Sequence, residues 1–155
     1  MIKGLYEAHL PVSNLEKSIE FYQKLDLEIA FREEKLAFFW IKKGESWLGL
    51  WETEQVHIPY HASLRHIALH IDQKDMDSAK DWLKERGIEV RTAFGFGSDR
   101  QPLVLPNSPQ AHAALYFSDP DGNSIELIAP LSHNMAENFK MMSLKEWRET
   151  KKMPF

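Results

Sequence analysis

Two kinds of hydrophobic pattern occur along the first third of the chain. Short runs rich in apolar residues and separated by polar turns are typical of strands, and they cover residues 5–12, 27–33, 36–42 and 46–52. Between the first two runs, residues 14–25 repeat apolar side chains every three to four positions, which predicts an amphipathic helix. Asn14 suits the N-cap of that helix because its side chain can accept a backbone hydrogen bond.

The same order of elements begins again after residues 52–63, which contain a proline and are predicted to be a linker. The elements expected in this second part are a strand at 65–71, a helix at 74–87, and strands at 88–94, 113–119 and 124–130. Residues 95–110 form a long loop that contains glycine and proline, and residues 132–152 favour one or two helices.

The chain therefore reads as β-α-β-β-β written twice. Placing Val12 on Ile71 aligns the two parts and puts Glu7 on His66. We predict an α+β fold in which paired βαβββ modules, at about 4–52 and 64–130, form a curled mixed sheet with a concave cavity. A C-terminal helical extension over 131–155 completes a single domain spanning residues 1–155.

One face of the predicted sheet is apolar, and the other is lined by ionisable and aromatic side chains. The residues expected on this second face are Glu7, His9, Trp47, Gly49, Trp51, His66, His70, Ser124 and Glu126. Carboxylates and imidazoles left unpaired in a dry interior cost several kcal/mol. Hydration, mutual pairing or a metal ion must therefore compensate them.

Composition narrows the classes of partner. The formal net charge is −4 over 155 residues, with no run of like charges, which disfavours nucleic acids and anionic membranes. The sequence contains no apolar stretch long enough to span a membrane and no signal-peptide pattern, so a cytoplasmic location is expected. The absence of cysteine excludes disulfides, thiolate ligands and a cysteine nucleophile.

Three stretches carry a family resemblance: HLPVSNLEKSIEFYQKL, RHIALHI and YFSDPDGNSIELI. They resemble the vicinal-oxygen-chelate superfamily, which includes glyoxalase I, extradiol dioxygenases, and fosfomycin- and bleomycin-resistance proteins. The resemblance covers about residues 4–130 and implies one divalent metal that chelates two neighbouring oxygens of a small substrate. It carries the ligands over to Glu7, His66 and Glu126, and it implies a homodimer.

The first strand departs from the commonest pattern of the family, because Glu7 stands where a His or Gln is usual. With Glu7 the ligand set of one imidazole and two carboxylates suits Mn, Fe or Mg better than Zn. With His9, two residues along on the same face, the set becomes the facial triad of non-haem iron chemistry. Alignment favours Glu7, the softer imidazole favours His9, and both stay open.

Three functions fit this pattern. The first is a metal-dependent lyase, isomerase or dioxygenase, with His9 or His70 as acid or base and Trp51 and Tyr116 shaping the pocket. The others are a metal-free antibiotic-sequestering protein of the bleomycin-resistance type and a fosfomycin-type resistance transferase. The transferase needs a cationic pocket, and few basic groups are predicted on the concave face. Arg100, in the long loop, is expected at the cavity mouth, where it could meet an anionic substrate.

Overall fold

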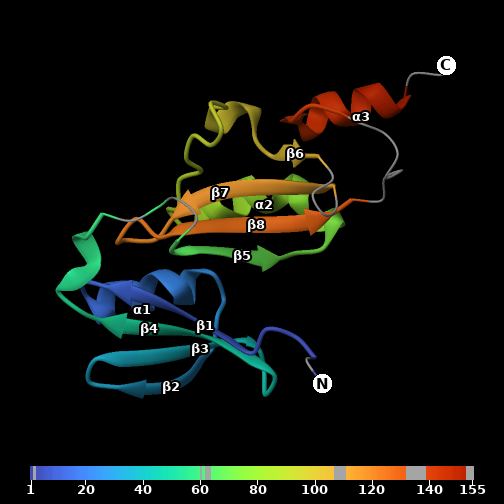
Figure 1. Ribbon diagram of the computed structural model, residues 1–155. Helices are drawn as coiled ribbons and strands as arrows, with labels where there is room; N and C mark the ends of the chain where they lie inside the picture. Colours follow the sequence, from blue (N-terminus) through green and yellow to red (C-terminus); the bar gives the residue numbers. More distant parts are fainter. Residues whose placement is uncertain (2, 60, 62–63, 107–110, 132–138, 153–155) are drawn as a thin grey trace. The chain divides into compact units, whose positions relative to one another are not determined.

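The computed structural model describes the chain except residues 2, 60, 62–63, 107–110, 132–138 and 153–155 (Figure 1). The backbone divides into two compact units. Unit 1 comprises residues 1–65 and 119–123, and unit 2 comprises residues 66–118 and 124–155.

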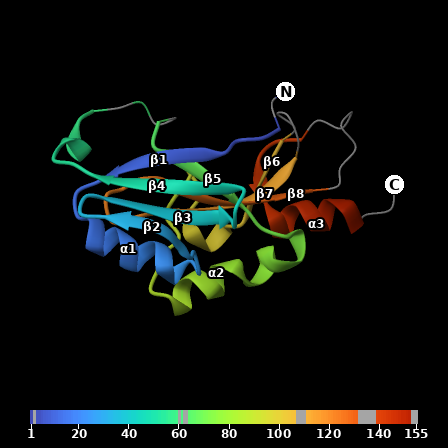
Figure 2. The same ribbon diagram turned by 90° about the horizontal axis from the view of Figure 1, so that it is seen from below.

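Unit 1 contains one helix and a four-stranded sheet. Its elements are β1 (Glu7–Val12), α1 (Leu15–Lys24), β2 (Ile29–Glu33), β3 (Leu36–Lys42), β4 (Ser46–Glu52) and the 3-10 turn η1 (Gln55–His57). The strand order is β1-β4-β3-β2, with β1 and β4 parallel and the other pairs antiparallel. Asn14 caps α1 by accepting from the Lys17 backbone N–H at 2.9 Å, as expected. The apolar stripe of α1 packs on β3 and β4 (Figure 2).

Unit 2 repeats this order and extends it. Its elements are β5 (His66–His70), η2 (Gln73–Asp75), α2 (Met76–Glu85), η3 (Ser98–Arg100), β6 (Leu103–Leu105), β7 (His112–Ser118), β8 (Ser124–Pro130), β9 (Met142–Ser143) and α3 (Leu144–Lys152). The strand order is β5-β8-β7-β6-β9, and β5 pairs with β8 in parallel as β1 pairs with β4. The expected α+β class, the βαβββ order of both parts and the C-terminal helix are confirmed. The single-domain organisation and the concave cavity stay predictions.

The predicted strand at 88–94 is wrong. Ile88 and Val90 are buried, which produces the apolar alternation, but the segment is not a strand, and it contacts β7 through a backbone hydrogen bond from the Arg91 N–H to the Tyr116 carbonyl. The edge of β7 is paired instead by β6, three residues inside the stretch expected to be a loop. Burial alone therefore gives this segment the sequence pattern of a strand, although the segment lacks the hydrogen-bond ladder that a strand forms with its neighbour.

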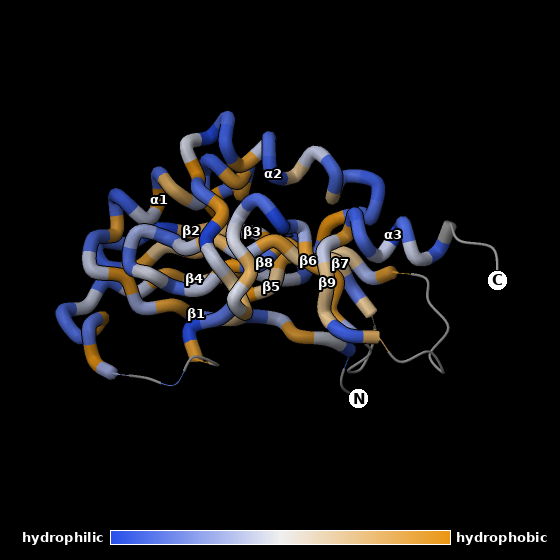
Figure 3. The backbone as a smooth tube through the Cα atoms, turned by 90° about the horizontal axis from the view of Figure 1, so that it is seen from above, coloured by the Kyte–Doolittle hydropathy of each residue, from blue (hydrophilic) through white to orange (hydrophobic). Residues whose placement is uncertain are grey.

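The core of each unit lies between its sheet and its helix. In unit 2 the large buried side chains come from both sources, among them Met76, Leu83, Leu115, Phe117 and Ile125. Hydrophobic colour follows β7 and β8, whereas α3 is mostly hydrophilic (Figure 3). Within the described residues, no helix has both the length and the apolar character needed to cross a membrane.

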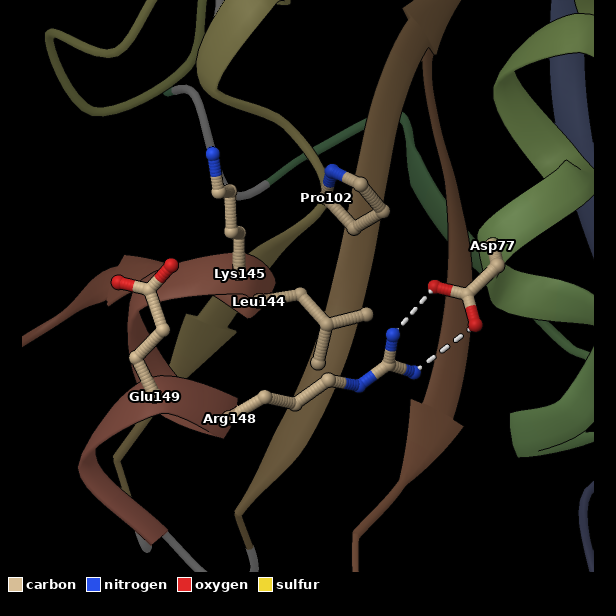
Figure 4. A pocket seen from close by; sticks show the side chains of 6 residues that line it. All are labelled: Asp77, Pro102, Leu144, Lys145, Arg148 and Glu149. Carbon is tan, nitrogen blue, oxygen red and sulfur yellow. Dashed lines mark hydrogen bonds and ion pairs between the residues drawn. The ribbon is translucent and has the colours of Figure 1, made fainter. Parts of the chain in front are cut away.

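The C-terminal helix α3 is joined to the rest of unit 2 by an ion pair and by buried apolar side chains. Arg148 donates two hydrogen bonds to Asp77 of α2, at 2.7 and 3.0 Å, beside a groove lined also by Pro102, Leu144 and Lys145 (Figure 4). Leu144 and Trp147 are buried within the same chain. Part of the apolar surface that suggested a homodimer is thus covered by unit 2 itself, and the homodimer stays a prediction.

Helix α3 begins with a capping box. Ser143 Oγ accepts from the Glu146 N–H at 3.2 Å, and the Glu146 carboxylate accepts from the Ser143 N–H at 2.8 Å. These bonds, from the Ser143 backbone first, then its hydroxyl, and then from Arg100, lower the pKa of Glu146 from 4.5 to about 2. The folded state therefore holds the ionised form of Glu146 more favourably than the unfolded chain does.

The capping box predicts a pH dependence. Because the pKa of Glu146 is lowered on folding, its contribution is complete above pH 4.5 and is lost as the pH falls towards 2. Glu146→Gln should therefore lower the urea midpoint at pH 6, and the gap from wild type should narrow below pH 4.5 and close only as the pH approaches about 2. Glu149→Gln on the same helix is the control and should leave the gap near zero throughout. A gap for Glu146→Gln that stays constant with pH would contradict the assignment.

Candidate metal and substrate site

Four polar side chains of unit 2 share the face of its sheet opposite α2. The register of β5 against β8 places His66 opposite Ser124, and that of β7 against β8 places Tyr116 opposite Glu126. Because side chains alternate along each strand, all four project from the same face. The strand pairing alone thus brings His66 and Glu126 together from positions 60 residues apart.

The imidazole of His66 lies between two oxygens. Its Nε2 is 3.1 Å from Glu126 Oε2, and its Nδ1 is 3.0 Å from Ser124 Oγ. The side chain of His66 is 33 % exposed, while that of Glu126 is 6 % exposed, so the imidazole is the accessible member of the pair. His112 approaches the other carboxylate oxygen, with Nε2 3.9 Å from Glu126 Oε1.

Glu126 carries a buried oxygen without a donor. Within the part of the chain that the structure describes, Oε1 accepts no hydrogen bond, which costs about 1–3 kcal/mol or more for a charged group. A cation would compensate it. Two ligand atoms each about 2.1 Å from one ion are about 3 Å apart at an octahedral angle, and the 3.1 Å between His66 Nε2 and Glu126 Oε2 fits that separation. The residues therefore suit a divalent metal.

Tyr116 lies beside this pair, with its ring 6.5 Å from that of His66. Burial first, and then the charge of Glu126 and a hydrogen bond with its carboxylate, hold the pKa of the Tyr116 hydroxyl well above its ordinary value. Tyr116 therefore keeps its proton at neutral pH and can donate a hydrogen bond. This suits the substrate-binding role expected from the sequence, which stays a prediction.

Unit 1 presents a second cluster on β1 and β4. Glu7 Oε2 accepts from Trp47 Nε1 at 2.8 Å, and His9 Nδ1 accepts from Trp51 Nε1 at 2.8 Å. An indole N–H only donates, so Nδ1 of His9 is the acceptor nitrogen. The proton of neutral His9 is then on Nε2, which lies 3.5 Å from Glu7 Oε1. Trp51, expected to bind substrate, thus orients His9.

Gly49 explains the placement of His9. A Cβ at Gly49 would come within 2.3 Å of His9 Nδ1 and 2.8 Å of Phe38, so any side chain there would displace the imidazole. The sequence predicts only that Gly49 lies on the polar face of the sheet. The structure shows that glycine in this strand makes room for a neighbouring ring, which is a common reason for glycine inside a strand.

Other residues expected at the site lie elsewhere or apart. Arg100 donates to Glu146 of α3 at 2.8 Å and lies over the ring of Phe96, which gives no support to a role at a cavity mouth. His70 is exposed at the end of β5, about 13 Å along the strand from His66. Across the described residues, no three His, Asp or Glu side chains form a complete ligand set. Joint ligation by Glu7, which belongs to unit 1, stays a prediction.

Sequence reasoning missed Arg91, Ser124 as a partner of His66, and His112. Arg91 donates to Ser124 Oγ at 2.7 Å and lies over the ring of Tyr116. A strand register derived from sequence could have placed Ser124 opposite His66. Nothing in the sequence marks Arg91, because it follows an apolar alternation that predicts an ordinary strand.

Comparison with known proteins identifies the fold family. Residues 4–127 match the Glyoxalase/Bleomycin resistance protein/Dioxygenase superfamily. The chain belongs to this superfamily. The resemblance of the three sequence stretches is thereby confirmed, because this superfamily and the vicinal-oxygen-chelate proteins are the same group.

Individual proteins of similar sequence or structure narrow the comparison further. Metallothiol transferase FosB of Staphylococcus haemolyticus is 34 % identical over 131 residues, covering 82 % of this chain and 84 % of that protein. The integron cassette protein HFX_CASS4, from the Halifax Harbour sewage metagenome, superposes with TM-score 0.64 at 25 % identity, over 83 % of this chain and 99 % of that one. Fosfomycin resistance protein FosX of Mesorhizobium loti superposes with TM-score 0.58 at 23 % identity, over 84 % and 95 %, and shows the shared fold alone.

Proposed function

We propose that this chain is a metal-dependent transferase that joins a thiol to a small substrate bound through two neighbouring oxygens. The observation that carries the proposal is the buried, donor-free Oε1 of Glu126 beside the accessible imidazole of His66. The FosB relative, named a metallothiol transferase, supports a transferase over the lyase, isomerase or dioxygenase expected from the sequence. Because the chain has no cysteine, the thiol comes from a second small molecule.

Glu7, His66 and Glu126 would hold the metal, with Mn, Fe, Mg and Zn as candidates. When bound, the ion supplies Lewis-acid polarisation of the substrate oxygens. For His66 to ligate through Nε2, its proton must sit on Nδ1, where Ser124 Oγ is placed to accept it at 3.0 Å. Ser124 thus fixes the orientation and the tautomer of His66.

The remaining groups would donate hydrogen bonds to the substrate or accept the proton of the thiol. In the transfer, sulfur bonds to a ring carbon of a strained cyclic ether such as that of fosfomycin, the carbon–oxygen bond at that carbon breaks, and the proton of the thiol ends on the ring oxygen, which stays attached through its second carbon. Tyr116, which keeps its hydroxyl proton, would donate a hydrogen bond to a substrate oxygen. His9 and His70 remain the candidates for receiving the thiol proton.

The test combines metal content with product mass. The chain, purified without chelator, should retain about one divalent ion per molecule by elemental mass spectrometry. With fosfomycin and a panel of low-molecular-weight thiols, it should form an adduct whose mass is the sum of the two reactants, and removal of the ion should abolish that adduct. Retained metal without any adduct would overturn the transferase and leave the metal site. A chain that binds no metal would favour the sequestering protein.

Assembly and location remain as expected from the sequence. A homodimer and a cytoplasmic location stay predictions. The proposed partner is a small-molecule substrate, because members of the superfamily bind small molecules.

A further inference from the structure

Gln101 lies where strand β6 no longer pairs with β7. The ladder ends at the pair of Leu103 and Ala114. Continuing its antiparallel register by two residues places Gln101 opposite Tyr116. The side chain of Gln101 makes the contact there, because its Oε1 accepts from the Tyr116 N–H at 3.1 Å and its Nε2 donates to the Arg91 carbonyl at 2.6 Å. A buried side-chain amide thus replaces the peptide group that a neighbouring strand would supply.

These bonds hold the backbone of Tyr116 from the edge of β7 that faces away from β8. The Tyr116 carbonyl accepts from the Arg91 N–H at 2.9 Å, so both polar groups of the Tyr116 backbone depend on this edge. Tyr116 is buried, so water is poorly placed to replace the acceptor that Gln101 provides. The position of the Tyr116 backbone, and with it the direction of the Tyr116 hydroxyl, therefore depends on Gln101.

The C-terminal extension holds Gln101 from both sides along the chain. Arg100, the residue before it, donates to Glu146 of α3 at 2.8 Å. The carbonyl of Pro102, the residue after it, accepts from the Leu144 N–H at 2.8 Å, and the two side chains line one groove (Figure 4). Strand β9 pairs with β6 directly beyond this point. The extension therefore limits how far the backbone of Gln101 can move.

We infer that Gln101 is a positioning residue for Tyr116 and that helix α3, by holding Gln101, controls the geometry of the site. Helix α3 lies beyond residues 4–127, which match the superfamily, so this control belongs to the C-terminal extension of the chain. The consequence for the reaction rests on the proposed function, in which Tyr116 donates a hydrogen bond to a substrate oxygen. Helix α3 acts through the segment around Gln101 and needs no contact with the substrate.

The first test is amide hydrogen exchange of the full chain, followed by NMR. The measured quantity is the exchange rate of the Tyr116 amide divided by that of the Phe117 amide, which points to β8 because successive N–H groups of a strand alternate in direction. This ratio cancels a change in global stability. Gln101→Met should raise the ratio about 10-fold, because the acceptor of the Tyr116 N–H is lost. Gln73→Met, an exposed position in η2, is the matched control and should leave the ratio unchanged.

Glu146→Gln tests the link to α3. Loss of the ion pair with Arg100 should loosen the segment before Gln101 and raise the same ratio by at least about 2- to 5-fold, the range expected for an exposed ion pair. Glu149→Gln on the same helix is the control and should leave the ratio as in wild type. A ratio that is the same for Glu146→Gln and Glu149→Gln would overturn the role of α3.

The rate of thiol-adduct formation gives the second measurement. Gln101→Met should lower kcat about 10- to 100-fold, because a small displacement of Tyr116 misplaces its hydroxyl. The metal should be retained, since His66 and Glu126 lie on β5 and β8. Unchanged kcat in Gln101→Met would overturn the positioning role.

The exchange ratio keeps this inference separate from the proposed function. Equal ratios in Gln101→Met and Gln73→Met would overturn the inference, even if wild type retains metal and forms the adduct. If wild type forms no adduct, the proposed function fails, and the ratios of Gln101→Met and Glu146→Gln still decide whether α3 positions Tyr116. A raised ratio in both variants, with both controls unchanged, supports the inference.

Discussion

Glu126→Gln is expected to lower the affinity of the chain for a divalent ion by about 100-fold or more. Loss of a residue that only hydrogen-bonds to a metal ligand already costs about 10- to 100-fold, so loss of a ligand should cost at least as much. The amide keeps the size of the carboxylate but removes the negative charge that a cation requires at the buried Oε1. The fold should persist, because glutamine fills the same space as glutamate and the substitution creates no cavity. Competition with a chromophoric chelator measures the affinity, and circular dichroism checks the fold.

Two further variants complete this test. His70→Gln is the matched control, because His70 lies on β5 like His66 but is exposed at its other end, and metal affinity should not change. His9→Ala decides the question left open on the first strand. Retained metal with lost turnover makes His9 an acid or base, whereas lost metal makes it the ligand in place of Glu7. Unchanged metal affinity in Glu126→Gln would refute the site.

Asp119→Ala is expected to destabilise the chain by about 3 kcal/mol or more, since several buried donors lose their acceptor at once. The carboxylate of Asp119 accepts from the Tyr22 hydroxyl at 3.0 Å, from the Asn123 side chain at 2.6 Å, and from the Asp121 and Asn123 N–H groups at 3.0 and 2.8 Å. Tyr22 and Asn123 are fully buried, so water cannot replace the lost acceptor. Urea unfolding monitored by fluorescence measures the change.

The neighbouring Asp121 provides the control for this prediction. Its carboxylate accepts one exposed hydrogen bond, from the Ser13 N–H at 2.9 Å, so Asp121→Ala should cost no more than about 1 kcal/mol. Equal losses for the two variants would mean that the turn, rather than the buried carboxylate, provides the stability.

The order of elements could be predicted from the sequence because burial on one face imposes its period on the chain. Asn14 and the turn at 119–123 gave additional boundaries, and the repeat followed from them. The strand at 88–94 could not be excluded, because Ile88 and Val90 are buried there without a partner strand. Burial sets the pattern, but hydrogen-bond pairing with another strand decides whether a strand forms.

At the site, the pairing of His66 with Glu126 followed from residue spacing and family resemblance. The roles of Gly49 and Trp51 could not be predicted, because they depend on the side-chain conformation of His9. Arg91 was missed for a similar reason, since its hydrogen bond to Ser124 Oγ depends on how residues 33 positions apart are brought together by the fold.

The turn at 119–123 belongs to unit 1 although the strands on either side of it, β7 and β8, belong to unit 2. A genetic dissection at the repeat boundary would therefore fail to isolate the first half. A fragment ending at Arg65 would lack the acceptors that Asp119 and Asn123 provide for Tyr22 and Arg65. To be autonomous, such a fragment would need the pentapeptide DPDGN restored by a graft or by circular permutation. The two repeats thus follow one another in the sequence, but a five-residue segment of the second repeat belongs to the first compact unit.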